Sequence, residues 1–263
     1  MTAVTLCPTR ILPVAVACLC LVSLPALSAE PSAAEISRQA RERGSLNLVG
    51  LQAELRLTTR GKDGREKVQV LRSAARTVQG RSASLARFLE PAGVAGVAVL
   101  TLAGEGGAPD EISIYLPKLK KVRRVAPGER GKSFQDTDFS YADLGSVGAR
   151  ERDVKKLGAE KVEGRDAWVL AGSAEEGSPY GQVKVWVDQQ SSVPVRAEYG
   201  DKQGQPFKVY RVLKLRKFGA RVLAAEAVME NLQAGSSTKV EILKLDETPL
   251  PEEAFSERGL ERG

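Results

Sequence analysis

Apolar and polar side chains alternate through most of the sequence after residue 50, and this pattern constrains the fold more than any other feature. Over residues 51–58 the stretch LQAELRLT alternates strictly, as a strand with one buried face does. Asp63-Gly64 then supplies a hairpin turn, and Glu163-Gly164 supplies another. About a dozen such segments follow one another, which predicts one continuous, strongly curved antiparallel β-sheet or open barrel. Beyond the first segment, we expect strands near residues 67–78, 84–89, 97–102, 111–116, 121–125, 153–160, 167–173, 182–188, 194–199, 207–215, 222–231 and 237–245.

Residues 30–46 have the pattern of a helix. Pro31 stands near its start, Ile36 belongs to a thin apolar stripe, and Gly44 ends it. The other faces are polar or charged. We therefore expect this helix to lie on a surface or across the opening of the sheet. At the other end of the chain we expect a proline-punctuated extended tail over residues 246–255 and frayed residues from 256 onward.

The first 29 residues read as a secretory signal peptide. Arg10 is the only charge before an apolar run over residues 11–27, and small residues follow it. Cleavage after Ser28 or after Ala29 fits the pattern. An uncleaved membrane anchor is the alternative, but the run is short for a span, which needs about 20 apolar residues. We expect export and a single domain over residues 30–263.

Chemistry is restricted by residues that the chain lacks. All three cysteines lie within the predicted signal peptide, and the sequence has no histidine. Cys18 follows Ala15-Val16-Ala17, a poor match to a lipoprotein-processing box, so we interpret Cys18 as part of the apolar core of the signal. Zinc sites of the Cys/His type and thiol nucleophiles are thereby excluded from the exported chain. We find no catalytic motif among the remaining residues and expect no enzyme activity, metal or cofactor.

The charge balance argues against nucleic acid as a partner. The net charge of +6 includes Arg10 and no acid from the predicted signal, so 6 − 1 leaves +5 on the exported chain. Such a modest excess suits solubility and weak attraction to anionic surfaces. We expect a monomer.

A dense basic patch follows the predicted strand at residues 111–116. One interpretation is attraction to acidic head groups or to an acidic partner surface. The other is a solvated edge strand that its charges protect from further pairing. The patch consists of Lys118, Lys120, Lys121, Arg123 and Arg124.

Acidic and aromatic residues are interleaved over residues 134–143. The spacing lacks the glycine and the downstream glutamate of a calcium-binding loop. We expect Asp138 to cap a short helix over residues 141–144 and the aromatic side chains to pack into the core. The acids are Asp136, Asp138 and Asp143, and the aromatic residues are Phe134, Phe139 and Tyr141.

Several blocks of the sequence resemble one family in the same order. They read ARFLEPAGVAGVAVLTL, EISIYLPKLKKVRRV, KSFQDTDFSYADL, YGQVKVWVDQQSSVPVRAEYGDKQGQPFKVYRV and ETPLPEEAF. They are similar to the LolA-like outer-membrane lipoprotein-sorting proteins of Gram-negative periplasms, the LolA/LolB superfamily. Asp136-Thr137 stands where that family has a glycine-serine step, and Ala142 stands where an acid is usual.

This resemblance implies an incompletely closed antiparallel sheet or barrel with one or more helices over its mouth. It also implies a cavity that shields acyl chains, because such chains are held by apolar surface alone, at about 25 cal/mol per Å² buried. The expected function is a periplasmic carrier of lipids or lipoproteins towards the outer membrane. The candidate lining residues are Phe88, Leu89, Val97, Val99, Ile112 and Ile114, with Phe134 and Phe139 near the rim.

A second interpretation keeps the same fold but removes transport. The protein would then be a binding module, either an envelope-stress sensor or an adaptor of a lipid-exporting transporter. Expected partners are lipid or lipoprotein acyl chains, and an inner-membrane lipid exporter or an outer-membrane acceptor. A hydrolase would rest only on unsupported combinations of Ser, Lys and Asp.

Overall fold

The computed structural model describes residues 1–3, 30–43, 48–105, 108–144, 152–174 and 177–262. It separates into two units, Met1–Glu30 and Pro31–Gly263. The second unit holds every helix and strand that is described. Residues 4–29, most of the predicted signal peptide, lie outside the described residues. Within the described residues, no helix combines the length and the apolar character needed to cross a membrane.

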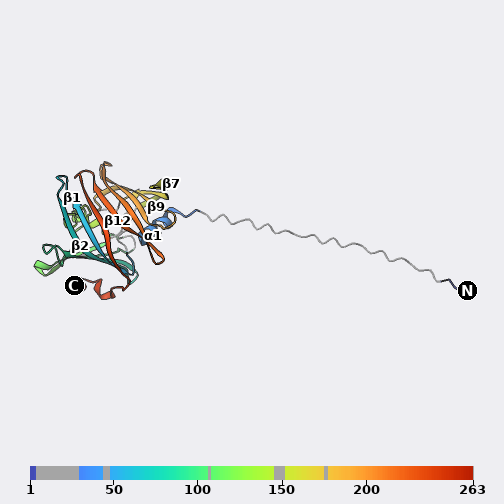
Figure 1. Cartoon of the computed structure of the whole chain (residues 1–263), viewed down its shortest axis with the longest axis horizontal. Coiled ribbons are helices and arrows are strands. Elements are labelled where there is room, and N and C mark those ends of the chain that lie inside the picture. The colour runs from blue at the N-terminus through green and yellow to red at the C-terminus, as the bar shows by residue number, and fades with distance from the viewer. Residues whose placement is uncertain (4–29, 44–47, 106–107, 145–151, 175–176, 263) are drawn as a thin grey trace. The chain divides into compact units, whose positions relative to one another are not determined.

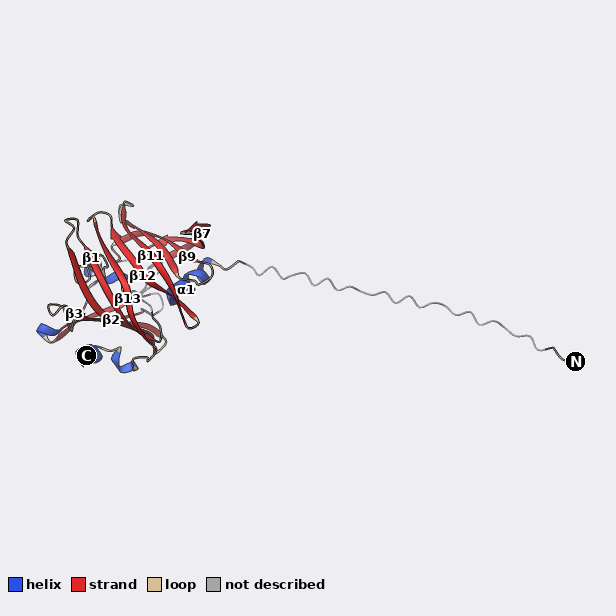
Figure 2. Ribbon diagram, viewed as in Figure 1, coloured by secondary structure: helices blue, strands red, loops and turns tan. Residues whose placement is uncertain are grey.

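The second unit is built on one 13-stranded antiparallel sheet that curls around an inner face (Figures 1 and 2). The strands form two meanders, β1 to β6 and β7 to β13, which meet where β1 pairs with β13. The predicted curved sheet is therefore confirmed, and most strands lie within a few residues of their expected positions. The strands are β1 (Leu51–Arg60), β2 (Glu66–Val78), β3 (Arg81–Glu90), β4 (Ala98–Leu102), β5 (Glu111–Leu116), β6 (Lys121–Arg124), β7 (Arg152–Val162), β8 (Arg165–Ser173), β9 (Tyr180–Asp188), β10 (Pro194–Asp201), β11 (Pro206–Phe218), β12 (Arg221–Asn231) and β13 (Ser236–Asp246).

The two outer edges of this sheet are β6 and β7, which are consecutive in the chain. The connection between them, residues 125–151, must therefore run from one edge of the sheet to the other. Its described part, residues 125–144, lies against the inner face and is called the plug below. The plug contains the short 3₁₀ helices η2 (Pro127–Glu129) and η3 (Tyr141–Asp143). A further one, η1 (Pro117–Leu119), forms the turn between β5 and β6.

Strand register brings apolar side chains from distant parts of the chain onto the inner face. Leu55 pairs with Leu71, which is adjacent in register to Phe88 on the next strand. The helix α1 (Ala33–Arg43) adds Ile36 and Ala40 to this inner core and contacts β7 and β8. It begins at Ala33 and not at residue 30 as predicted, and its expected end at residues 44–46 lies outside the described residues.

A second, smaller core lies on the outer face of β2 to β4. The C-terminal segment covers it through η4 (Glu252–Ala254) and α2 (Glu257–Arg262). Phe255 is 3% exposed and Leu260 is fully buried, and the guanidinium of Arg87 donates to the carbonyl of Leu260 at 2.8 Å. The prediction of a frayed end is thus wrong, because the outer face of these strands is apolar and needs a cover. The covered residues are Ala74, Ala83, Leu85, Ala98 and Leu100.

We predict that Phe255→Ala lowers the free energy of unfolding by about 3–5 kcal/mol, the usual cost of deleting a buried phenylalanine ring. Urea denaturation followed by tryptophan fluorescence measures the change. Leu119→Ala is the control, because that side chain is 63% exposed and its loss should cost less than about 0.5 kcal/mol. Equal stability of Phe255→Ala and the wild type would contradict a structural role for the C-terminal cover.

Candidate functional site

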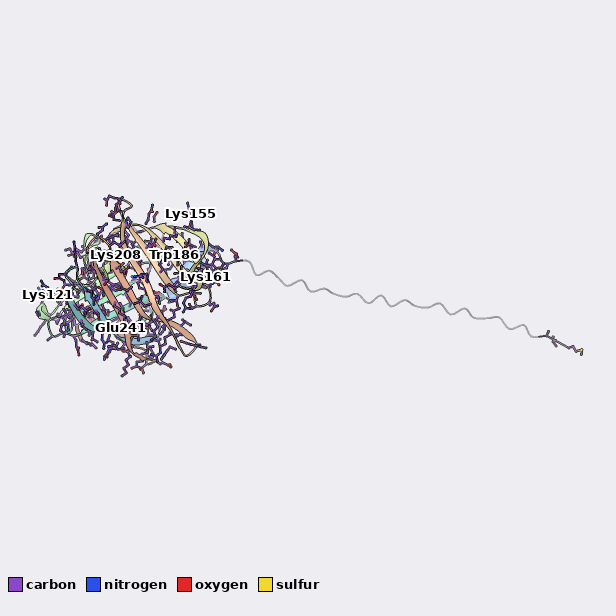
Figure 3. The ribbon with its side chains drawn as sticks, turned by 45° about the horizontal axis from the view of Figure 1, so that its top comes forward. Lys121, Lys155, Lys161, Trp186, Lys208 and Glu241 are labelled. Carbon is purple, nitrogen blue, oxygen red and sulfur yellow. The ribbon has the colours of Figure 1, made fainter. Side chains whose placement is uncertain are left out.

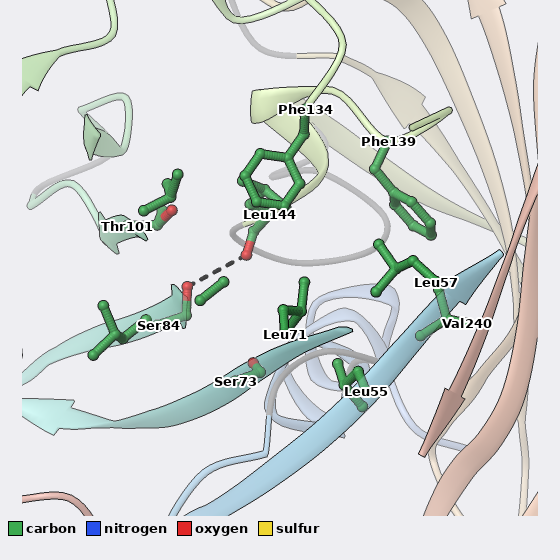
Figure 4. A pocket seen from close by; sticks show the side chains of 13 residues that line it. Leu55, Leu57, Leu71, Ser73, Ser84, Thr101, Phe134, Phe139, Leu144 and Val240 are labelled. Atoms are coloured by element: carbon green, nitrogen blue, oxygen red, sulfur yellow. Dashed lines mark hydrogen bonds between the residues drawn. The ribbon is translucent and has the colours of Figure 1, made fainter. Parts of the chain in front are cut away.

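A cavity lies on the inner face between the plug and the strands beneath it (Figure 4). Its volume is about 30 Å³, about twice the space that one water needs (~10–15 Å³) and far below the ~300–1,000 Å³ of typical ligand pockets. Little free space is therefore left between the plug and the strands that line this cavity. The lining residues are Leu55, Leu57, Leu71, Ser73, Ser84, Leu85, Ala86, Val99, Thr101, Phe134, Phe139, Leu144 and Val240.

The lining is apolar apart from three hydroxyl side chains, and it carries no charged residue. Figure 4 shows Phe134, Phe139 and Leu144 of the plug pointing towards the strands. The ring of Phe134 lies 5.0 Å from that of Phe88 and 5.9 Å, edge-on, from that of Tyr141. The contact with Phe88 packs the plug against β3, and the contact with Tyr141 lies within the plug.

Three of the eight candidate lining residues reach this cavity: Val99, Phe134 and Phe139. Four other candidates are buried in the inner core without lining the cavity, and the fifth, Leu89, is only half-buried. The four buried candidates are Phe88, Val97, Ile112 and Ile114.

The residues expected from the sequence to line the cavity include none from the two central strands, β1 and β13, although both strands line it. Leu55 and Leu57 come from β1 and Val240 from β13. The alternation over residues 51–58 already places the two leucines on one face. The pairing of Leu57 with Val240 joins segments that are far apart in the sequence, and periodicity alone does not reveal it.

The first anchor of the plug is Asp138. Its carboxylate accepts hydrogen bonds from the hydroxyls of Ser236 and Thr238 on β13, the latter at 2.7 Å, and its backbone N–H donates to the Thr238 hydroxyl at 2.9 Å. The prediction that Asp138 caps the short helix is wrong. The cap is Ser140, whose backbone N–H donates to the carboxylate of Asp143 at 2.7 Å.

The second anchor is a buried polar network that joins the plug to β9 and β11. The carboxylate of Asp143 accepts a hydrogen bond from the Tyr180 hydroxyl at 2.8 Å and pairs with the Lys208 ammonium at 3.3 Å. The same ammonium donates to the Tyr180 hydroxyl at 3.1 Å. The side chains of Lys208 and Asp143 are 5% and 3% exposed. Every charge in the network is therefore paired, as burial requires.

The remaining acid of the predicted cluster lies apart from these anchors. The carboxylate of Asp136 is 87% exposed and pairs with the ammonium of Lys67 at 2.8 Å. The three acids thus serve three separate structural contacts, and within the described residues no group of potential ligands forms a metal site.

The basic patch divides into free and paired charges. Arg123 pairs with Glu129 at 2.7 Å, and Arg124 lies 3.4 Å from Glu111 and 3.6 Å from Glu257. The three lysines are exposed, and none has an ion-pair partner among the described residues. They surround the exposed Leu119 at the turn between β5 and β6. The lysines are Lys118, Lys120 and Lys121.

We predict a fall in stability at alkaline pH that depends on Tyr180. Burial raises the pKa of Tyr180 well above its ordinary value near 10, and the negative charge of Asp143 raises it further. Above about pH 10 the unfolded chain therefore loses the phenolic proton while the folded chain keeps it, and unfolding becomes easier. Tyr180→Phe should remove a slope of up to about 1.4 kcal/mol per pH unit, measured by urea denaturation between about pH 8 and pH 11.

The matched control for this measurement is Val185→Ala, which truncates a buried side chain in the same core without removing a titrating group. It should lower stability equally at each pH. The same alkaline slope in Tyr180→Phe and Val185→Ala would contradict the assignment to Tyr180.

Solved structures with this arrangement of strands are known. One described as an outer membrane lipoprotein-sorting protein domain, from Vibrio parahaemolyticus, has a TM-score of 0.78 and 26% identity, over 88% of this chain and 98% of its own. A DUF1329 family protein from Desulfovibrio piger has a TM-score of 0.74 and 22% identity, over 87% and 95%. A LolA superfamily protein from Nitrosomonas europaea has a TM-score of 0.67 and 18% identity, over 86% and 98%.

No curated protein matches the sequence. A family model described only as that of an uncharacterized protein matches residues 80–262. This span runs from β3 through the plug to the C-terminal cover. The chain therefore belongs to that uncharacterized family, and its fold is the LolA-like fold that the sequence resemblance predicts.

Proposed function

We propose that this protein is a periplasmic carrier that shields the acyl chains of lipids or lipoproteins on their way towards the outer membrane. The observation that carries the proposal is the charge-free, largely apolar cavity on the inner face of a LolA-like sheet. The likeness to a structure described as a lipoprotein-sorting domain supports the same role. Such a carrier uses no catalytic residue, metal or cofactor.

Loading requires the plug to move. A cavity of about 30 Å³ admits no acyl chain, whereas Phe134, Phe139 and Leu144 cover apolar strand residues that a chain would also cover (Figure 4). Exchange of plug for ligand keeps the apolar strand surface away from water, so the hydrophobic contributions of the two states largely offset each other at about 25 cal/mol per Å². The ligand thus competes with the plug for one surface.

The small volume also favours a second candidate, a binding module that does not transport its ligand. In that case the plug would stay in place and the protein would act as an envelope-stress sensor or an adaptor of a lipid-exporting transporter. Lipid mass spectrometry of the protein purified from a native envelope separates the two. A co-purifying amphiphile supports the carrier, and lipid-free protein that refuses added lipid supports the module.

We predict that a disulfide across the first anchor blocks lipid uptake. Asp138→Cys with Thr238→Cys places two thiols where the native side chains meet at 2.7 Å, and the natural cysteines all lie in the predicted signal peptide. The oxidised protein should bind a fluorescent fatty-acyl probe at least about tenfold more weakly than the same protein after reduction, since a difference of about 1.4 kcal/mol suffices.

Each single-cysteine variant is a control for the loss of one native side chain and for the reductant itself. Neither single variant should change its binding of the probe on reduction. Equal binding by the oxidised and reduced double variant would contradict the requirement for plug movement.

We further propose that the turn between β5 and β6 docks on an anionic membrane surface or on an acidic partner, such as an inner-membrane exporter or an outer-membrane acceptor. Leu119 is 63% exposed there among the three free lysines. The turn lies at the β6 margin of the sheet, and Figure 3 shows Lys121 on the far side from Lys155 and Lys161 of β7.

We predict that replacing Lys118, Lys120 and Lys121 with glutamine weakens sedimentation with phosphatidylglycerol vesicles about 100-fold, because each lysine near such a surface contributes about 1 kcal/mol. The matched control carries the same change of charge at three other exposed lysines and should bind nearly as the wild type does. Equal losses in both variants would show a general effect of charge and contradict docking through this turn. The control positions are Lys62, Lys202 and Lys217.

A further inference from the structure

Three hydroxyl side chains lie next to one another on the wall of the cavity. Ser73 belongs to β2, Ser84 to β3 and Thr101 to β4. Ser84 and Thr101 are paired in register, and Ser73 lies beside them, paired with Ala86. We call these three residues the hydroxyl wall. Figure 4 shows Ser84 and Thr101 on one side of the cavity and the apolar residues Leu57 and Val240 on the other.

The hydrogen-bonding capacity of the hydroxyl wall is largely unused. Thr101 is 3% exposed, and its hydroxyl oxygen is buried without a hydrogen-bond partner among the described residues. The hydroxyl of Ser84 donates to the carbonyl of Leu144 at 3.3 Å (Figure 4), its one hydrogen bond among the described residues. Ser73 is 5% exposed, and its hydroxyl makes no hydrogen bond within the described part of the chain.

Burying the Thr101 hydroxyl without a partner is unfavourable by about 1–3 kcal/mol. Valine or alanine would fill the same positions on a strand without that cost. The arrangement therefore suits a ligand that brings its own polar group to this side of the cavity, and that displaces Leu144 from Ser84 when the plug moves.

The ligand group that fits here is neutral. No Lys, Arg, Asp or Glu lines the cavity, so a buried carboxylate or phosphate would have no counter-charge and would be costly to desolvate. Hydroxyl groups donate hydrogen bonds to a carbonyl oxygen. An ester carbonyl is neutral, accepts such bonds and stands directly at the head of an acyl chain.

We propose that the hydroxyl wall binds the ester carbonyl of an O-acylated lipid, while the hydrocarbon chain lies along the apolar side of the cavity formed by Leu55, Leu57 and Val240. This inference rests on the proposed carrier function and deepens it. It names the ligand class as acyl esters of a glycerol-like alcohol and excludes free fatty acids as the preferred ligand.

The test compares two probes that differ only in the carbonyl group, 1-palmitoylglycerol and its ether analogue 1-hexadecylglycerol. The exported wild-type protein should bind the ester about five- to tenfold more tightly than the ether, as one or two hydrogen bonds would provide. A variant with Ser73→Ala, Ser84→Ala and Thr101→Val should bind both probes alike, with an affinity for the ether close to that of the wild type.

The matched control is Leu55→Ala, which removes apolar surface from the same cavity. It should weaken both probes equally and keep the preference for the ester. Equal binding of ester and ether by the wild type would overturn the inference, as expected if the wall merely holds water. A preference for the ester that survives in the triple variant would also overturn it.

If the protein is not a lipid carrier, the result is different, because the wild type would then bind neither the ester nor the ether probe. Thermal unfolding of the triple variant checks that it folds. Thr101→Val alone provides a second test, because it is nearly isosteric and removes the hydroxyl that has no partner. That variant should lose part of the preference for the ester, and an unchanged preference counts against the proposal.

Discussion

A single crossing of the chain from one edge of the sheet to the other determines most of this structure. Because β1 and β13 pair in the centre, each meander ends at an outer edge, and β6 and β7 are joined across the inner face. The crossing segment must satisfy its own polar backbone there. It does so with short 3₁₀ turns and with two side-chain anchors, Asp138 and Asp143. Its apolar side chains then fill the curve of the sheet.

Local features of this fold were predictable because they depend on neighbours in the sequence. Alternation gave the strands and, with the family resemblance, pointed to Val99, Phe134 and Phe139 at the cavity. The contacts that were missed depend on long-range register. Asp138 looked like a helix cap because Thr238, a hundred positions away, gives no local signal. The segment around Leu260 was predicted to be frayed because its six-residue helix is mostly polar. Its one buried apolar contact is with the outer core, which is far away in the sequence.

The second anchor uses charge where apolar packing would also hold the plug. A buried ion pair often contributes little net stability compared with apolar residues of similar size, but removal of one partner costs about 3–5 kcal/mol. The network of Lys208, Asp143 and Tyr180 therefore makes one position of the plug much better than any neighbouring position. Aromatic and aliphatic contacts alone would tolerate sliding along the apolar inner face.

The combination of apolar contacts and polar anchors would also suit release of the plug in the proposed carrier. In the proposed carrier, the apolar middle of the plug and an acyl chain would cover the same strands with similar free energy per unit area, so the anchors would decide which of them is bound. An anchor that breaks must leave no buried charge unpaired. Asp143 keeps its hydrogen bonds from Ser140 if the plug moves as a unit, whereas Lys208 would lose its carboxylate partner. In the proposed carrier, the cost of exposing or neutralising this one lysine would be part of the threshold for opening.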